Sequence, residues 1–138
     1  MTTKEEAEKI IEEFSYFDDW MDKYAYIIEL GKSLSTIDEA YRQDKYLIEG
    51  CQSNVWLQAN YENGKLYFKA DSDAIITKGI IYLLIRVLSD RTPQEILDAD
   101  LSYIDTIGLT SHLSPTRSNG LLSMIKQIKV YALAYQNK

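Results

Sequence analysis

One side chain of this sequence stands out as a potential nucleophile, the single cysteine Cys51. Its neighbours Gly50, Gln52 and Ser53 are residue types that favour turns. We therefore expect the thiol at the tip of a connection between two strands, where functional side chains are more common than in a core. The alternative is that Cys51 is a small buried apolar residue, as most free cysteines are.

Two other side chains are candidates to assist this thiol. An ordinary thiol with a pKa of ~8.5 is only a few per cent ionised at pH 7, so a nucleophile needs a neighbouring base or cation. His112, the single histidine, is a candidate base, and its alternative role is that of an ordinary surface or core histidine. Arg117 is a candidate cation that would form an anion pocket with helix N–H groups, and its alternative is an exposed arginine.

The sequence lacks the residues that metal binding, disulfide formation and nucleotide binding need. One cysteine and one histidine form neither an internal disulfide nor a structural zinc site of four such ligands, so we expect no metal and a reducing, cytoplasmic compartment. The sequence also lacks the motifs G-x-x-x-x-G-K-[ST], G-x-G-x-x-G, H-E-x-x-H and C-x-x-C. We therefore expect no nucleotide site.

The composition narrows the class of protein further. The chain has 138 residues with 21 acidic and 15 basic side chains, and its apolar fraction of 46% is typical of a folded domain rather than a disordered segment. A net charge of −6 argues against partners such as nucleic acid or an anionic membrane surface. The longest apolar run, 74–88, is shorter than the ~20 residues that span a bilayer. The N-terminus lacks an apolar signal core, so we expect one cytoplasmic domain over 1–138.

Cap motifs predict where the helices that position these residues begin. Thr3-x-x-Glu6 has capping-box spacing, and Asp18 is the expected N-cap of a second helix that ends at Gly31 with a left-handed cap. A cap at 71–73 precedes the apolar helix 74–88. Thr92-Pro93 and Ser114-Pro115 each place proline at the first position of a later helix.

The middle of the chain predicts a β-hairpin. Asn63-Gly64 favours a type I′ turn, and folding about it pairs Glu62 with Lys65. This register gives one apolar and one polar face; the apolar face holds Val55, Leu57, Ala59, Tyr61, Leu66, Phe68 and Ala70. The run 46–49 is an expected third strand. The predicted fold class is α+β, a two-layer domain with a three-stranded antiparallel sheet and helices packed on one face.

Trp56 falls on the otherwise polar face of this hairpin, a few residues from Cys51. Either another segment of the chain covers the indole, or it is an exposed aromatic anchor for a partner protein beside the thiol.

Four ordered motifs make the chain resemble the SufE family, sulfur acceptors of iron–sulfur cluster assembly, together with their close relative CsdE. They are Trp20-x-x-Lys23-Tyr24 with Ile27-Ile28-Glu29-Leu30-Gly31; Gly50-Cys51-Gln52-Ser53-x-Val55-Trp56; Ala70-Asp71-Ser72-Asp73-Ala74; and Leu109-Thr110-x-His112-Leu113-Ser114-x-x-Arg117-x-Asn119-Gly120. The resemblance covers nearly the whole chain and implies a SufE/IscU-like fold. Some family members have Leu-Pro where this chain has Leu34-Ser35, a departure in a loop.

The resemblance implies a specific activity. SufE-like proteins stimulate a cysteine desulfurase of the SufS or CsdA kind, accept its persulfide sulfur on the residue matching Cys51, and pass the sulfur to an iron–sulfur scaffold. Pyridoxal phosphate belongs to the desulfurase, so we expect an accessory protein without a cofactor of its own. Gly50, Gln52, Ser53, His112 and Arg117 are then candidate supporting residues. Trp56 and Asp73 are candidate partner-binding residues.

Two alternatives remain open at this stage. A self-contained hydrolase or acyltransferase would use Cys51 as nucleophile and His112 as base, and would show a Cys–His hydrogen bond. An interaction module would carry an incidental cysteine.

Overall fold

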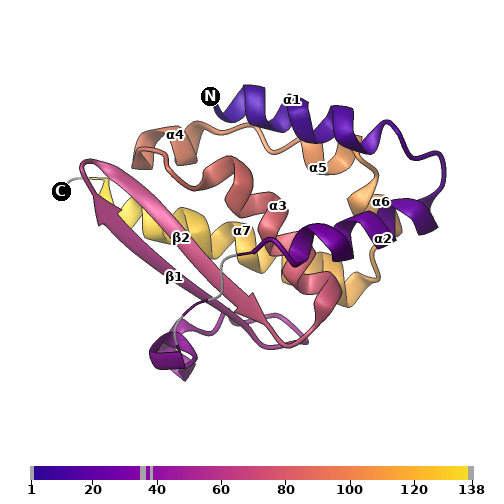
Figure 1. Cartoon of the computed structure of the whole chain (residues 1–138). Coiled ribbons are helices and arrows are strands. Elements are labelled where there is room, and N and C mark those ends of the chain that lie inside the picture. The colour runs from indigo at the N-terminus through magenta and orange to yellow at the C-terminus, as the bar shows by residue number, and fades with distance from the viewer. Residues whose placement is uncertain (1, 35–36, 38, 137–138) are drawn as a thin grey trace.

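The computed structural model describes residues 2–34, 37 and 39–136. Ser35 of the Leu34-Ser35 departure lies outside the described residues, as do both ends of the expected 1–138 domain. Figure 1 shows helices, a hairpin and further helices in chain order. The helices are α1 (Thr3–Phe14), α2 (Trp20–Gly31), α3 (Ile75–Leu88), α4 (Pro93–Asp98), α5 (Tyr103–Thr106), α6 (Leu109–His112) and α7 (Pro115–Tyr135), the strands are β1 (Val55–Glu62) and β2 (Lys65–Ser72), and η1 (Glu39–Tyr41) and η2 (Asp44–Tyr46) are 3-10 turns.

Side-chain caps begin most of the longer helices. Thr92 caps α4 in a capping box and Ser114 caps α7, each followed by proline as predicted. The first two caps lie one residue away from their predicted positions, since Thr2 caps α1 and Asp19 caps α2. Ala74 precedes α3 without a side-chain cap, because residues 71–72 belong to β2.

The hairpin has the predicted register. Glu62 pairs with Lys65 and Leu57 with Ala70. Both turn residues have positive φ, 52° at Asn63 and 82° at Gly64, as a type I′ turn requires. Val55, Leu57, Leu66, Phe68 and Ala70 of the predicted apolar face are buried.

The prediction of a third strand was wrong. Among the described residues the sheet has two strands, and segment 46–49 contributes an isolated bridge between Leu47 and Trp56. The cause is local: the 3-10 turn η2 ends at Tyr46, and Gly50 turns the chain away with a φ of +91°. The segment is therefore too short to form a strand. The predicted α+β class is confirmed by the hairpin and the helices around it.

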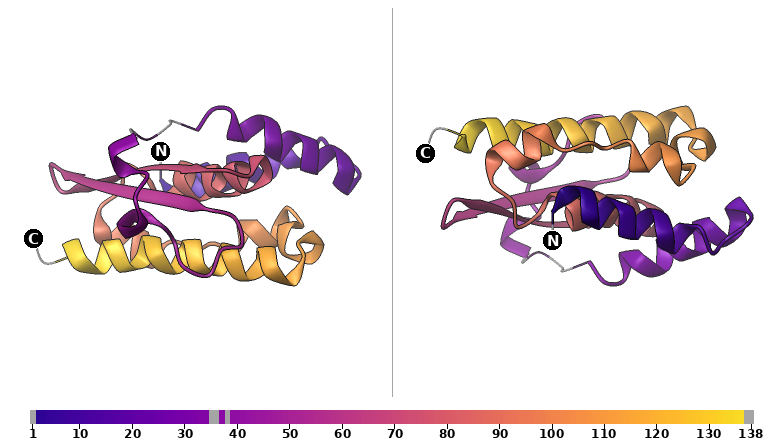
Figure 2. Two further views of the ribbon diagram at one scale, coloured as in Figure 1. Left: turned by 90° about the horizontal axis from the view of Figure 1, so that it is seen from below. Right: turned by 90° about the horizontal axis from the view of Figure 1, so that it is seen from above.

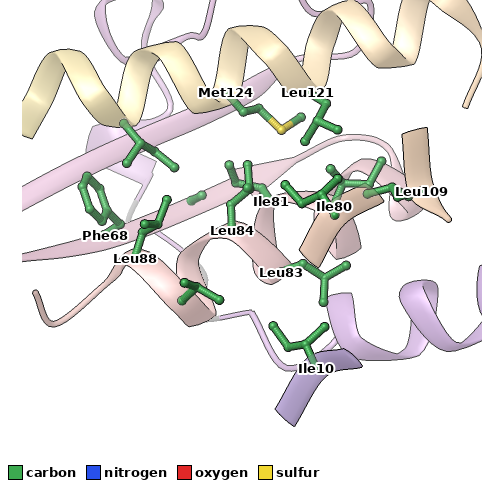
Figure 3. Packing of buried hydrophobic residues seen from close by; sticks show 14 of the residues in the cluster. Ile10, Phe68, Ile80, Ile81, Leu83, Leu84, Leu88, Leu109, Leu121 and Met124 are labelled. Carbon is green, nitrogen blue, oxygen red and sulfur yellow. The ribbon is translucent and has the colours of Figure 1, made fainter. Parts of the chain in front are cut away.

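The core lies between the hairpin and two long helices. Figure 3 shows Ile80, Ile81 and Leu84 of α3 facing Leu121 and Met124 of α7. Both views in Figure 2 place α7 at the outside of the molecule, along the hairpin. The turns η1 and η2 contact β1. Arg42, directly after η1, forms an ion pair with Asp71, which pairs with Trp56 on the polar face of the hairpin, so the helical elements are not confined to one face.

Gly31 has a different role from the predicted left-handed cap. It is the last residue of α2 and lies against α3, where a Cβ would come within 2.8 Å of the Gly79 backbone nitrogen. A Cβ on Gly79 would in turn come within 2.5 Å of the Ile27 side chain. The two glycines therefore permit a close crossing of α2 and α3.

Candidate functional site

Cys51 lies on a loop, as predicted, but the loop connects the isolated bridge at Leu47 to β1 rather than two strands. We call residues 49–54 the Cys51 loop. Gly50 gives this loop its shape, because its φ of +91° lies in the left-handed region that favours glycine. A Cβ on Gly50 would also overlap the hydroxyl group of Ser123 on α7. The loop therefore rests directly on α7.

Hydrogen bonds hold the base of the Cys51 loop to the end of β2. The Asn54 N–H donates to Asp73 Oδ1 at 3.2 Å, and the Asp73 N–H donates to the Asn54 carbonyl at 3.3 Å. The Ser72 hydroxyl donates to the same Asn54 carbonyl at 2.8 Å. These bonds fix the loop at one end and leave its tip held by contacts with α7.

The thiol of Cys51 is half-buried and faces the first turns of α7. Its Sγ donates to the Gly120 carbonyl at 3.6 Å. A small cavity of about 50 Å³ lies beside it, lined by Cys51, Gln52, Ser53, Thr77, Ile80, Thr116, Arg117, Gly120 and Met124. Burial raises the pKa of the Cys51 thiol above its ordinary value. The resting thiol is therefore protonated at neutral pH.

Arg117 lies where the sequence predicted, in the first turn of α7. Its N–H donates to the capping hydroxyl of Ser114 at 3.2 Å, and the residue lines the cavity beside Cys51. Its side chain is exposed, and within the described part of the chain it forms no ion pair. The guanidinium therefore has no acidic partner among the described residues.

His112 belongs to a different contact. Its ring stacks on the indole of Trp20 with centroids 4.4 Å apart, and its Nδ1 lies 2.8 Å from the Gly108 carbonyl oxygen. It is not among the residues that line the Cys51 cavity. Over the described residues, no Cys–His hydrogen bond joins it to the thiol. In this arrangement His112 fastens α6 to α2.

The two candidate partner-binding residues flank the Cys51 loop. Trp56 is half-buried on the polar face of the hairpin, next to Leu47, so part of the indole is covered by the chain. Asp73 is exposed, and one of its oxygens holds Asn54. Beside it, Asp71 is buried and forms ion pairs with Arg42 and Lys78.

The residues that complete the cavity were not predicted as site residues, although Gly120 ends the fourth family motif. Thr77 and Ile80 come from α3, and Thr116, Gly120 and Met124 come from α7. The apolar stripes of α3 and α7 predict which face of each helix is buried, but they do not predict that a thiol lies against that face. Ser123, which contacts Gly50, carries no motif at all.

No group of three or more histidine, cysteine or acidic side chains among the described residues is placed to hold a metal ion. In the same residues, none of the helices combines the length and the apolar character needed to cross a bilayer.

Comparison with known proteins gives the family. Residues 8–132 match the SufE family model, described as an Fe–S metabolism associated domain. An uncharacterized SufE-like protein of Rhizobium meliloti (strain 1021) is 39% identical over 127 residues, which are 88% of this chain and 91% of that protein. A hypothetical protein from Thermus thermophilus, solved in solution, has the same fold, with a TM-score of 0.78 at 16% identity over 96% of this chain and 97% of that one. This chain belongs to the SufE family, and its domain is one associated with iron–sulfur metabolism.

Proposed function

We propose that this protein accepts sulfur from a pyridoxal-phosphate-dependent cysteine desulfurase as a persulfide on Cys51, and carries it toward iron–sulfur cluster assembly. The observation that carries the proposal is the position of the thiol. Cys51 lies at the tip of a loop whose base is tied to β2 and whose tip rests on α7 through Gly50 and Gly120. A thiol at such a tip can reach into another protein when the contacts with α7 are released.

The transfer is a relative of thiol–disulfide exchange. The Cys51 thiolate attacks the outer sulfur of a cysteine persulfide on the desulfurase, and a new S–S bond forms on Cys51. The S–S bond of the donor breaks, and its electron pair leaves on the donor's cysteine as a thiolate. The Cys51 proton goes to a base or to water, so the step consumes no oxidant or reductant.

The resting structure favours storage over reaction. Burial raises the pKa of Cys51, so the thiol is protected from oxidation while the loop rests on α7. Roughly 10–15 Å³ of such space holds one water molecule, so the cavity of about 50 Å³ has room for one additional sulfur atom. Arg117 lines that cavity and is a candidate partner for the negative charge of a persulfide.

The protein would act as a cytoplasmic accessory to the desulfurase and would need no cofactor of its own. The Cys51 thiol donates to a backbone carbonyl of α7, and His112 is engaged with Trp20. This arrangement supports a sulfur carrier rather than a self-contained Cys–His enzyme, which needs the imidazole at the nucleophile.

The test measures the turnover of a purified cysteine desulfurase on free cysteine, with and without this protein. We expect wild-type protein to raise the rate of alanine release and Cys51→Ser to leave it at the basal value. Stimulation that persists in Cys51→Ser would refute sulfur acceptance on this residue. Turnover of thioesters or peptides by the isolated protein would favour the thiol enzyme.

A further inference from the structure

The last helix differs in charge from the rest of the molecule. The chain carries 21 acidic residues and a net charge of −6, yet α7 (Pro115–Tyr135) contains no acidic residue and three cations, Arg117, Lys126 and Lys129. The helix is therefore a positive strip on an acidic protein.

The same helix exposes apolar side chains. Leu122, Val130 and Leu133 have exposed fractions of 64%, 45% and 58%. With Lys126 and Lys129 they form a surface that we call the α7 outer face, opposite to the side that buries Leu121, Met124 and Ile128 in the core. Figure 2 shows α7 as an outer element in both views, without another helix or strand on its far side. Large apolar side chains exposed together on one helix face mark an interaction surface more often than those exposed singly.

A groove lies between this surface and the start of the Cys51 loop. It has a volume of about 380 Å³ and is lined on one wall by residues 44, 45 and 47–49, and on the other by Ser123, Lys126 and Gln127. Glu49 is two residues before Cys51, and Ser123 is the residue on which Gly50 rests. A protein that contacts the Cys51 loop from this side would meet the groove and then Lys126.

Charge decides between the possible occupants. A second copy of this chain whose two-fold axis passes through the α7 outer face would place Lys126 and Lys129 close to the same lysines, with no acidic residue on the helix to pair them. The acidic residues Asp44 and Glu49 lie on the other wall of the groove. An anionic membrane would attract these two lysines by only about 1 kcal/mol each while repelling a molecule of net charge −6. A protein surface with carboxylates around an apolar centre satisfies both kinds of side chain.

We propose that the α7 outer face, with its groove, is a docking surface for the cysteine desulfurase, which presents carboxylates to Lys126 and Lys129 and apolar side chains to Leu122 and Leu133. This inference rests on the proposed function. A stable interface covers about 800 Å² on each partner, a patch roughly 30 Å across. Leu122 and Leu133 are only ~16 Å apart along the helix axis, and Leu122 is directly followed by Ser123, the residue on which Gly50 of the Cys51 loop rests. An interface centred near Cys51 is therefore large enough to include this face.

The test is the affinity of the full chain for a purified, pyridoxal-phosphate-loaded cysteine desulfurase, measured by titration calorimetry at low and high salt. Two double variants remove the two kinds of contact, Leu122→Gln with Leu133→Gln and Lys126→Glu with Lys129→Glu. We expect each to raise Kd about 10-fold or more, and we expect charge reversal to abolish the loss of affinity with salt seen for wild type.

Matched controls change the same chemistry elsewhere. Lys4→Glu with Lys9→Glu makes the same change of net charge on exposed positions of α1, and Met21→Gln removes an exposed apolar side chain from α2. Both are expected to bind within about twofold of wild type. Circular dichroism confirms that each variant is folded.

The outcomes separate this inference from the proposed function. If the α7 variants bind like wild type while wild type still accepts sulfur, the docking surface is refuted and the function stands. If wild type binds no desulfurase and accepts no sulfur, the function itself fails. Concentration-dependent dimerisation that the leucine variants abolish, or binding of wild type to phosphatidylserine vesicles that the lysine variants abolish, would assign the face to another occupant and refute the proposal.

Discussion

The conformation of Gly50 sets how firmly the Cys51 loop rests on α7, so Gly50→Ala is the substitution that tests this contact. Its φ of +91° lies where a residue with a Cβ is strained, and the new methyl group would overlap the Ser123 hydroxyl. The left-handed backbone alone costs a non-glycine residue about 1–2 kcal/mol. If that cost falls on the docked loop, the ratio of released to docked loop rises about 5- to 30-fold.

The assay follows alkylation of Cys51 by iodoacetamide at a pH near 7.5, read as intact mass against time. Release of the loop removes the burial that raises the pKa of the thiol, so alkylation proceeds mainly through the released state. We expect the alkylation rate of Gly50→Ala to rise by about the same 5- to 30-fold factor. Adding Ser123→Ala should recover only the part of the effect that comes from the overlap with the hydroxyl.

Gly64→Ala is the matched control. Gly64 also has a positive φ, 82°, but it lies at the distant hairpin turn, with open space around it. This variant should lose a similar amount of stability in urea without faster alkylation of Cys51. Equal alkylation rates in Gly50→Ala and wild type would refute the idea that this backbone conformation holds the thiol against α7.

Three further predictions concern the elements around the site. Gly79→Ala should lower the free energy of unfolding by about 1–3 kcal/mol, because the new methyl group would overlap Ile27 where α2 crosses α3. Alanine has the better helix propensity, so without this overlap the variant would be neutral or more stable. A neutral or stabilising effect in urea unfolding would therefore contradict the close crossing. His112→Ala should lower the free energy of unfolding by about 1 kcal/mol, because the stack with Trp20 is lost. His112→Phe keeps an aromatic ring at this position and should accept sulfur at a rate within about twofold of wild type. A large loss of sulfur acceptance in His112→Phe would indicate that the imidazole acts as a base. Burial opposes ionisation of Asp71, but its hydrogen bond and two ion pairs outweigh burial and leave its pKa below the usual value. Asp71→Asn should therefore destabilise the protein at pH 7, and in urea unfolding this difference should become smaller as the pH falls below about 4 and through the folded pKa. A difference that does not become smaller in acid would contradict this prediction.

Local sequence patterns predicted the features that depend on neighbouring residues. Asn63-Gly64 dictates the turn and hence the register of the hairpin, because only one pairing leaves the apolar side chains on one face. Thr92-Pro93 and Ser114-Pro115 likewise contain both the cap and the first helical residue. The position of Cys51 in a connection follows from the turn-forming residues around it.

Contacts between distant segments were harder to predict. Gly31 has the residue type of a helix C-cap, but its function in the fold depends on Gly79, 48 positions later. His112 was a candidate for the thiol site because an imidazole can act as a base and because it belongs to the fourth motif, but its stack with Trp20 has no signature in spacing. Segment 46–49 has strand-forming residues, yet the turns on both sides of it limit the pairing to a bridge at Leu47.

The most direct test of sulfur acceptance follows the sulfur atom itself. A desulfurase is first loaded with persulfide and freed of cysteine, then mixed with this protein in the absence of reductant, and both intact masses are recorded over time. We expect the desulfurase to lose ~32 Da while this protein gains ~32 Da, with the gain mapped to Cys51 and absent in Cys51→Ser. A donor that keeps its sulfur, or a gain in mass that survives Cys51→Ser, would contradict sulfur acceptance on Cys51.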